Sequence, residues 1–408
     1  MTFSALLRRH PAALGFGFLL ALASSPGQTF VISLFLPGMK TSFGIDDAEI
    51  AGLYAVATIT SAAVLWFAGR WIDQVDLLRY SLSSGLFLAV ACLFTAAATL
   101  VPLLAIGFFA LRLGGQGLLT HVAVTAVARY FTKARGKALS LTSIGHSVGE
   151  ALLPGIVVVL IGLWGWRPAL AAVGGCALLL VMAANLLVRK NLNFRHPRNA
   201  MVANDDVSGQ HPPKAATPDF LRSSYFLLNI PLFMATPLVV TALVFHQAMI
   251  AEARGFSLQW FAIAFIAFAL ARVASALLTG PLIDRYGASR IFPFHLLPFV
   301  LGIAALAAGS ADWTVPLYWA LAGITSGMAG TLQAAIIGEH VAPHRLGAMR
   351  SVLAALSILA SAAGPVLYGW LAASGVPVSQ QLWGSVTAMI IATFLGVFAG
   401  TSALTKSA

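Results

Sequence analysis

The sequence predicts an all-α polytopic membrane protein with twelve transmembrane helices arranged as two six-helix bundles. Hydrophobic residues make up 59% of the 408 residues and charged residues only 9%, whereas soluble proteins carry about 25% charged residues. A loop pattern also occurs twice in the same register, as expected for two similar halves. The basic residues fall mainly in short segments that flank the apolar ones.

Twelve apolar segments are long enough to cross a bilayer. A helix rises about 1.5 Å per residue, so about 20 residues span ~30 Å of hydrocarbon. The first segment, preceded by Arg8 and Arg9, could instead be a cleavable secretion signal. Its apolar character continues to Leu36, which favours an uncleaved first span. The predicted spans lie at residues 11–37, 46–69, 78–99, 102–128, 137–162, 167–188, 222–250, 256–280, 289–309, 314–338, 349–373 and 380–403.

The repeated loop indicates an internal duplication. Gly69-Arg70-Trp71-Ile72-Asp73 recurs as Gly280-Pro281-Leu282-Ile283-Asp284, and Arg79 and Arg290 follow the two aspartates at the same distance. Each pair is separated by 211 residues, as are Pro26 and Pro237, Gly136 and Gly347, and Pro154 and Pro365. We expect an N-terminal bundle at residues 1–190, a polar cytoplasmic linker at 191–220 and a C-terminal bundle at 221–408.

The distribution of positive charge predicts the orientation. With both termini inside, nineteen of the 24 Lys and Arg residues are cytoplasmic, and three, Lys40, Arg167 and Arg254, are outside. This asymmetry predicts an integral protein of the cell (inner) membrane with cytoplasmic termini. It also explains the net charge of +11 without nucleic acid as a partner. The two cysteines, Cys92 and Cys176, lie in apolar runs and predict neither a disulfide framework nor a metal site.

The repeated loop resembles a signature of the major facilitator superfamily, Gly-x-x-x-Asp-Arg-x-Gly, which lies between helices two and three and again between eight and nine. The second copy matches with Gly280, Asp284, Arg285 and Gly287. The first copy departs from the signature, because Gln74 and Asp76 stand where the family has Arg and Gly. The resemblance covers the whole chain and implies that two halves rock around a central cavity.

Two further segments extend this resemblance. Arg112-Leu-Gly-Gly-Gln116-Gly117 is similar to the family's Arg-containing motif in the fourth helix, with one extra residue before the Gln-Gly pair. The stretch from Arg129 through Gly145 to Gly149 resembles that of monocarboxylate and oxalate–formate porters. The resemblance implies that Asp73 and Asp284 act in a cytoplasmic gate that stabilises the outward-facing state.

Arg112 and Glu150 are the predicted ionisable groups near the middle of spans four and five. Charged groups within a bilayer are costly and mark functional sites by default. The two residues lie at similar distances from the hairpin that joins their spans, so an ion pair is plausible. Such a pair could simply lock the bundle, or Glu150 could exchange protons while Arg112 holds it or binds substrate.

His146 lies one helical turn before Glu150, so the two side chains share a face. An imidazole changes charge near neutral pH and could relay a proton to the carboxylate. The alternative is that His146, like His121 and His246, is a hydrogen-bonded packing residue.

Arg272 is the leading candidate for substrate contact. It lies in span eight, eight residues before Gly280, at a depth that reaches past the headgroups. Its planar guanidinium suits a carboxylate or phosphate. The resemblance supports this role, because anion porters of the superfamily often carry an Arg in the eighth helix. Snorkelling, or binding to helix carbonyls, is the structural alternative.

Several uncharged residues are weaker candidates. Gln28 and Thr29 follow Pro26-Gly27 in span one, where Pro and Gly would loosen the helix and release carbonyl groups for a ligand. Gln116, Gln247 and Gln333 could also contact substrate, although helix-packing contacts are equally compatible. The glycines of spans four and ten predict close helix approach and match no phosphate-binding loop.

Together these features predict a secondary active transporter, not an enzyme, that moves a small organic anion by alternating access. Two basic residues within spans against one acid favour an anion, and Glu150 with His146 suggests proton coupling. We expect no cofactor and no metal, and the partners are the substrate, protons and the lipid bilayer, with the protein acting as a monomer. The alternative is export of drugs or metabolites by proton antiport. A membrane sensor is disfavoured by the retained gate motif.

Overall fold

The computed structural model describes residues 3–131, 134–191, 194, 223–341 and 346–405. The described chain is helical, and twelve helices are long and apolar enough to span a membrane, which confirms the predicted fold class. Contacts divide the chain into two units, Met1–Ile45 with Gly52–Gly209, and Asp46–Ala51 with Gln210–Ala408. Most of the linker predicted at 191–220 lies outside the described residues.

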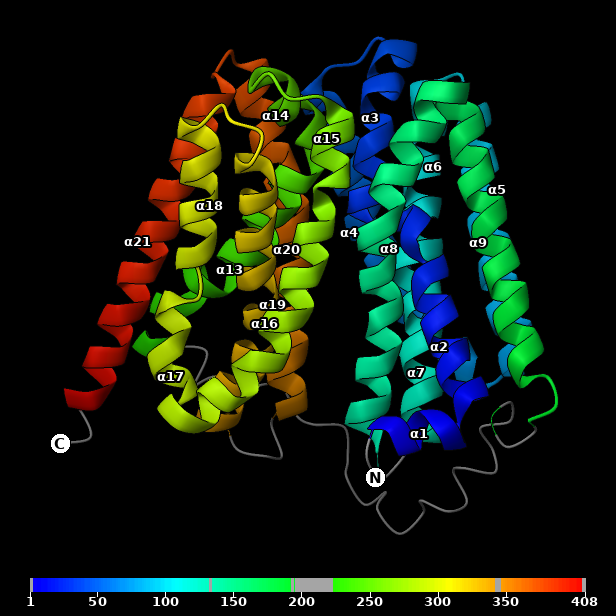
Figure 1. Cartoon of the computed structure of the whole chain (residues 1–408), viewed down its shortest axis with the longest axis horizontal. Helices are drawn as coiled ribbons and strands as arrows, with labels where there is room; N and C mark the ends of the chain where they lie inside the picture. The colour runs from blue at the N-terminus through cyan, green and yellow to red at the C-terminus, as the bar shows by residue number, and fades with distance from the viewer. Residues whose placement is uncertain (1–2, 132–133, 192–193, 195–222, 342–345, 406–408) are drawn as a thin grey trace. The chain divides into compact units, whose positions relative to one another are not determined.

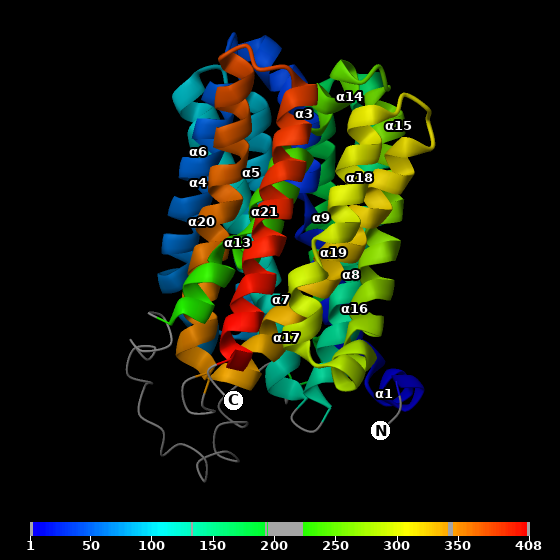
Figure 2. The same ribbon diagram turned by 90° about the vertical axis from the view of Figure 1, so that its left-hand side faces the viewer.

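Unit 1 carries the first six spans (Figures 1 and 2). Three spans are interrupted, because short 3₁₀ segments or a π segment replace regular α-helix within them. The elements are α1 (Phe3–Arg9), α2 (Pro11–Ala23), η1 (Ser25–Gly27), α3 (Thr29–Phe43), α4 (Asp47–Ala68), η2 (Gly69–Asp73), α5 (Leu77–Ala97), α6 (Val101–Leu111), the π segment η3 (Arg112–Leu119), α7 (Thr120–Tyr130), α8 (Arg135–Trp164) and α9 (Trp166–Val188).

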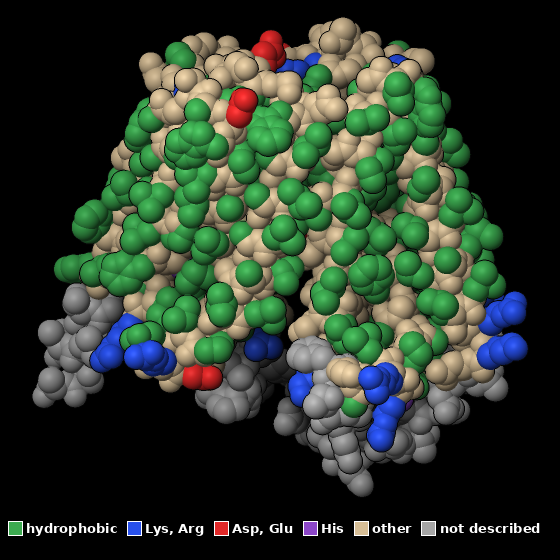
Figure 3. All heavy atoms as spheres, viewed as in Figure 1, with side chains coloured by type: hydrophobic (Ala, Val, Ile, Leu, Met, Phe, Trp, Pro, Cys, Tyr) green, Lys and Arg blue, Asp and Glu red, His purple; other side chains and the backbone are tan. Residues whose placement is uncertain are grey.

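Unit 2 carries the other six spans. In each unit a band of hydrophobic side chains covers the middle of the helices, and Lys and Arg gather near one end (Figure 3). The elements are α13 (Ser224–Phe245), α14 (Gln247–Ala253), α15 (Leu258–Ile263), α16 (Phe265–Tyr286), α17 (Ala288–Ile291), η5 (Phe292–Phe294), α18 (Leu297–Ala308), α19 (Thr314–His340), α20 (Leu346–Ala373) and α21 (Val378–Thr405).

The first span is broken between α2 and α3 for reasons visible in the sequence. Pro26 has no N–H to donate to the carbonyl of Leu22, and the hydroxyl of Ser25 donates to that carbonyl instead, at 2.7 Å. Ser24 similarly donates to the carbonyl of Ala21 at 2.7 Å. These short polar side chains satisfy backbone groups that a break inside a membrane would otherwise leave unpaired.

The proline that occurs at the equivalent position of both repeats interrupts the helix only in the first repeat. Pro26 lies in the break, whereas Pro237, its counterpart 211 residues later, lies inside the continuous helix α13. Gly27 follows the first proline and Leu238 the second. Glycine carries no side chain to stabilise a helix and disfavours it, so the Pro-Gly pair, and not the proline alone, accounts for the break.

The repeated loop differs from the expected pair of matching loops. The first copy forms the 3₁₀ segment η2, whereas the second lies within α16, which stays helical through Tyr286 despite Pro281. The turn therefore falls at Gly287, where φ is +81°, a value that favours glycine.

Asp76 explains why the first copy departs from the family signature. Its carboxylate accepts hydrogen bonds from the backbone N–H groups of Leu78 and Arg79 and so caps the N-terminus of α5. In the second copy the equivalent residue is Gly287, and Glu339 of α19 binds the N–H of Ala288 instead, at 3.0 Å. Each repeat thus supplies a carboxylate to the same helix start from a different position in the sequence.

Candidate functional site

Arg112 is buried in unit 1, with 3% of its surface exposed. It begins the π segment η3, and its Nη1 donates a hydrogen bond to the carbonyl of Gly27 at 3.2 Å. That carbonyl is available because the amide of Val31 bonds to Gln28 and not to Gly27. The guanidinium also lies over the ring of Tyr54, 5.0 Å from its centroid, as in a cation–π contact. The break in span one and the π segment in span four therefore hold one buried cation between them.

Hydroxyl and amide groups complete the surroundings of this break. The hydroxyls of Thr29 and Tyr54 are 2.6 Å apart, so α3 and α4 are joined beside Arg112. The side-chain amide of Gln28 reaches the hydroxyl of Thr120 on α7 at 3.4 Å. Gln28 is buried, as expected of a residue in a polar contact within the bundle.

Glu150 and His146 form a contact pair on α8. His146 Nε2 lies 3.4 Å from Glu150 Oε1, one helical turn apart. The carboxylate side chain is 5% exposed and the imidazole 25% exposed, so the imidazole is the more accessible of the two. His146 also packs edge-on against Phe30 at the start of α3, with ring centroids 5.8 Å apart. The pair therefore lies against the same broken span as Arg112.

The ion pair suggested for Arg112 and Glu150 is not among the contacts of the described residues. Arg112 contacts Gly27 and Tyr54, whereas Glu150 contacts His146. The Nε atom of Arg112 is buried without a hydrogen-bond partner in the described part of the chain. A buried donor of this kind is costly unless a ligand or water reaches it. We call Gln28, Thr29, Tyr54, Arg112, His146 and Glu150 the span-one cluster.

Glycines bring the backbones of the cluster together. A Cβ at Gly115 would lie 2.5 Å from the carbonyl oxygen of Ser24, and one at Gly27 would clash with the carbonyl of Leu111. On α8, Gly145 and Gly149 face span one in the same way. The predicted role of the glycines of spans four and ten is confirmed here and at Gly323 and Gly327, which pack against α16, although Gly330 faces open space.

Replacing Gly115 by alanine tests whether this packing positions the cluster. The new methyl group must push span one away, so we expect a loss of about 1–3 kcal/mol in stability and a marked loss of transport. Gly117→Ala is the matched control, because its Cβ would meet Leu113 at an ordinary 3.5 Å. Thermal unfolding of the purified proteins measures the difference, and equal stability of the two variants would contradict it.

The other predicted substrate residues are distributed over both units. Arg272 is half-buried on α16, with its guanidinium 5.9 Å from the ring centroid of Phe268. Gln247 is buried at the start of α14, and Gln333 is half-buried on α19. Gln116 is exposed, although it lies in the same π segment as Arg112.

The predicted gate residues lie at helix ends and are mostly exposed. Gly69 begins η2, and its carbonyl contacts Nε2 of His121 at 3.2 Å, which gives that histidine a packing role. The side chain of Asp73 lies outside the described residues. The guanidinium of Arg285 stacks on Tyr286. The exposed members are Arg79, Asp284, Arg285 and Arg290, and Gly280 lies half-buried within α16.

Sequence reasoning named Thr29 beside Gln28 as a weaker candidate but missed Tyr54 as a part of the cluster. Tyr54 carries no charge and lies in an apolar segment where an aromatic residue attracts no notice. Tyr54 could be recognised only through Arg112, because an Arg inside a membrane needs favourable contacts and an aromatic face can supply one of them.

Two six-span repeats, an interrupted helix and buried ionisable side chains are typical of secondary transporters. A sequence model of the Major Facilitator Superfamily matches residues 18–266 and 236–406. The chain belongs to this superfamily, whose members are transporters and not enzymes. The sequence resemblance is thereby confirmed at the level of the superfamily, and the monocarboxylate or oxalate–formate subfamily stays a prediction.

Similar structures agree with the fold. A bacterial homologue of the human lysosomal transporter Spinster, crystallised inward-facing and unoccupied, is 16% identical and superposes with a TM-score of 0.72 over 97% of this chain and 98% of that one. The nucleoside transporter NupG is 13% identical, with a TM-score of 0.69 over 95% and 98% of the two chains. At these identities the likeness concerns the fold alone.

A curated relative matches only in part. The multidrug resistance protein B homologue of Mycobacterium tuberculosis is 31% identical over 88 residues. That match covers 22% of this chain and 16% of the relative's length.

Proposed function

We propose that this transporter moves a small organic anion together with protons. The observation that carries the proposal is Arg112, a buried guanidinium in unit 1 with one donor that no described residue fills. An anionic group that reached this donor would form a charge-assisted hydrogen bond in a medium of low dielectric. The titratable pair Glu150 and His146 packs on the same broken helix and supplies a proton-binding group.

In the proposed cycle the span-one cluster binds both cargoes. The substrate carboxylate binds Arg112, and the hydroxyls of Thr29 and Tyr54, 2.6 Å apart, orient it. Glu150 takes up a proton, for which the more exposed His146 provides the route. A neutral Glu150 no longer repels the anion, so the two bind cooperatively. Proton release on the opposite side of the membrane then weakens anion binding and favours release of the substrate.

The arrangement across the membrane is part of the same proposal. The charge asymmetry of the loops supports cytoplasmic termini, and the repeat supports two bundles, at residues 1–190 and 221–408, joined by a linker. Asp73 and Asp284, with Arg79, Arg285 and Arg290, would serve as the cytoplasmic gate, and the protein would act as a monomer in the inner membrane.

Arg272 is the proposed anion contact of unit 2. Arg272→Lys keeps the charge but loses the planar fork, so we expect weaker binding with some remaining function. Arg272→Ala should reduce affinity about 10–100-fold, because a charge-assisted hydrogen bond contributes about 1.5–3 kcal/mol. Equilibrium binding to the purified protein measures both variants. If the alanine variant binds as tightly as the wild type, Arg272 is structural.

Uptake into proteoliposomes tests the proposed function. The protein is reconstituted and offered a panel of labelled carboxylates, with and without an inward proton gradient. We expect at least one carboxylate to accumulate, and accumulation to require the gradient. Empty liposomes and the Arg112→Ala variant are the controls. If no anion accumulates under either condition, the anion assignment fails.

Export of drugs or metabolites by proton antiport is the second candidate. It is supported by the 88-residue match to a protein named for multidrug resistance. The same liposomes distinguish the two functions, because an antiporter accumulates a cationic or neutral dye under an outward proton gradient and leaves the carboxylates untouched.

A further inference from the structure

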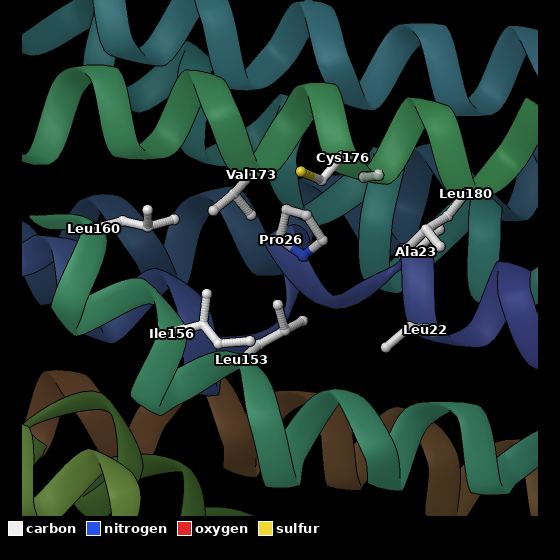
Figure 4. Close-up of a pocket in the computed structure, with 10 residues that line it drawn as sticks. Leu22, Ala23, Pro26, Leu153, Ile156, Leu160, Val173, Cys176 and Leu180 are labelled. Atoms are coloured by element: carbon white, nitrogen blue, oxygen red, sulfur yellow. The ribbon is translucent and has the colours of Figure 1, made fainter. Parts of the chain in front are cut away.

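A small apolar groove lies on unit 1 beside the break of span one (Figure 4). Its walls come from α8 and α9, and the ring of Pro26 lies between them. Leu153 and Ile156 line one wall, and Val173 and Cys176 the other. The lining residues are apolar apart from the thiol of Cys176, so the groove offers no strong hydrogen bond to a polar ligand.

The position of the groove along the spans indicates what surrounds it. Pro26 lies near the middle of the span Pro11–Phe43, and Cys176 near the middle of Trp166–Val188. Exposed leucines flank the groove on both helices, with Leu152 at 53% and Leu179 at 65%. Such side chains face hydrocarbon in a membrane protein, so the groove is at the depth of the lipid acyl chains and not of the headgroups.

The size of the groove restricts the occupant. Its volume is about 80 Å³, whereas pockets for drug-sized ligands measure about 300–1,000 Å³. A helix with side chains is about 10–12 Å across and cannot enter it. A flexible hydrocarbon chain is thin and apolar, and a short part of it matches the small volume and the apolar lining of the groove.

We propose that one acyl chain of a membrane phospholipid occupies this groove and packs on Pro26. The chain would fill the space beside a segment that lacks regular helical structure, on the span whose Gly27 carbonyl binds Arg112. An empty groove would deprive its apolar walls of van der Waals attraction, and an acyl chain that enters it restores that attraction. The lipid is therefore a specific ligand of unit 1, in addition to any transported substrate.

Photolabelling tests this site in the intact protein. The purified chain is reconstituted with a small fraction of phosphatidylcholine that carries a diazirine midway along one acyl chain, and labelled peptides are identified by mass spectrometry. We expect labelling of residues 153–160 and 173–180 to saturate and to be displaced by unlabelled phosphatidylcholine. Labelling around the lipid-facing Phe394, which is 70% exposed, should instead rise linearly with the amount of lipid.

Two groove-filling variants and one control complete the test. Ala177→Leu and Leu160→Trp place extra atoms in the groove from different helices. Either variant therefore still tests the site if the other one misfolds. Both should lose the saturable labelling, whereas Leu179→Phe, outside the groove, should keep it. Linear labelling at the groove, saturable labelling in both filled variants, or displacement by a drug-sized apolar compound but not by phosphatidylcholine would overturn the proposal.

Discussion

Arg112→Ala should strongly weaken anion binding and transport while the protein still inserts and folds. The substitution removes the buried donor that we assign to the substrate, and losing a charge-assisted hydrogen bond costs about 1.5–3 kcal/mol, or roughly 10–100-fold in affinity. It also leaves the Gly27 carbonyl without its side-chain partner, which lowers stability by about 1–3 kcal/mol. Binding and thermal unfolding of the purified variant measure the two effects separately.

Arg112→Lys separates these roles. A lysine keeps the charge and can still reach a carbonyl, but it lacks the planar fork. We expect most of the stability to return and only part of the affinity. Arg129 provides a matched control, because it too binds a backbone carbonyl, that of Ile72 at 3.4 Å, but lies at the far end of span four. Equal losses of affinity in Arg112→Ala and Arg129→Ala would contradict a substrate role for Arg112.

Glu150→Gln should uncouple transport from protons. The amide is close in size to the carboxyl group but cannot ionise, so it imitates the protonated state permanently. Gradient-driven accumulation should fall to the level of equilibration, whereas exchange of internal for external substrate should persist. Uptake with and without an imposed pH gradient measures the first effect, and counterflow of labelled substrate measures the second.

Glu252→Gln is the control for this experiment, because Glu252 is exposed on α14 outside the spans. It should leave accumulation unchanged. If Glu150→Gln still accumulates substrate against a gradient, the carboxylate has a structural role and the contact with His146 serves packing.

The fold was predictable because each span carries its own signal. Twenty apolar residues report a membrane helix without reference to the rest of the chain, and all twelve expected spans are present. The boundaries were less accurate. The first span continues past Pro37 to Phe43, because a proline within a helix bends it without necessarily ending it.

The candidate site was only partly predictable, because its geometry depends on contacts between spans. Arg112 and Glu150 stand out as ionisable groups in apolar segments. Their partners depend on the break at Pro26-Gly27 and on the π segment of span four, which direct Arg112 to Gly27 and Tyr54. Equal depth suggested an ion pair, but depth does not fix the direction of a side chain around its helix axis.

The most direct test of the account is the pH dependence of anion binding to the purified wild-type protein. The central claim is that the span-one cluster binds an anion and a proton together, so a carboxylate that stays ionised throughout should bind less tightly as pH rises. In the pH range where the cluster has lost its proton before the anion binds, the affinity should fall about tenfold per pH unit if one proton is taken up with each anion. The Glu150→Gln variant should show no such slope. An affinity of the wild-type protein that is independent of pH, or that increases with pH as proton antiport predicts, would contradict the claim.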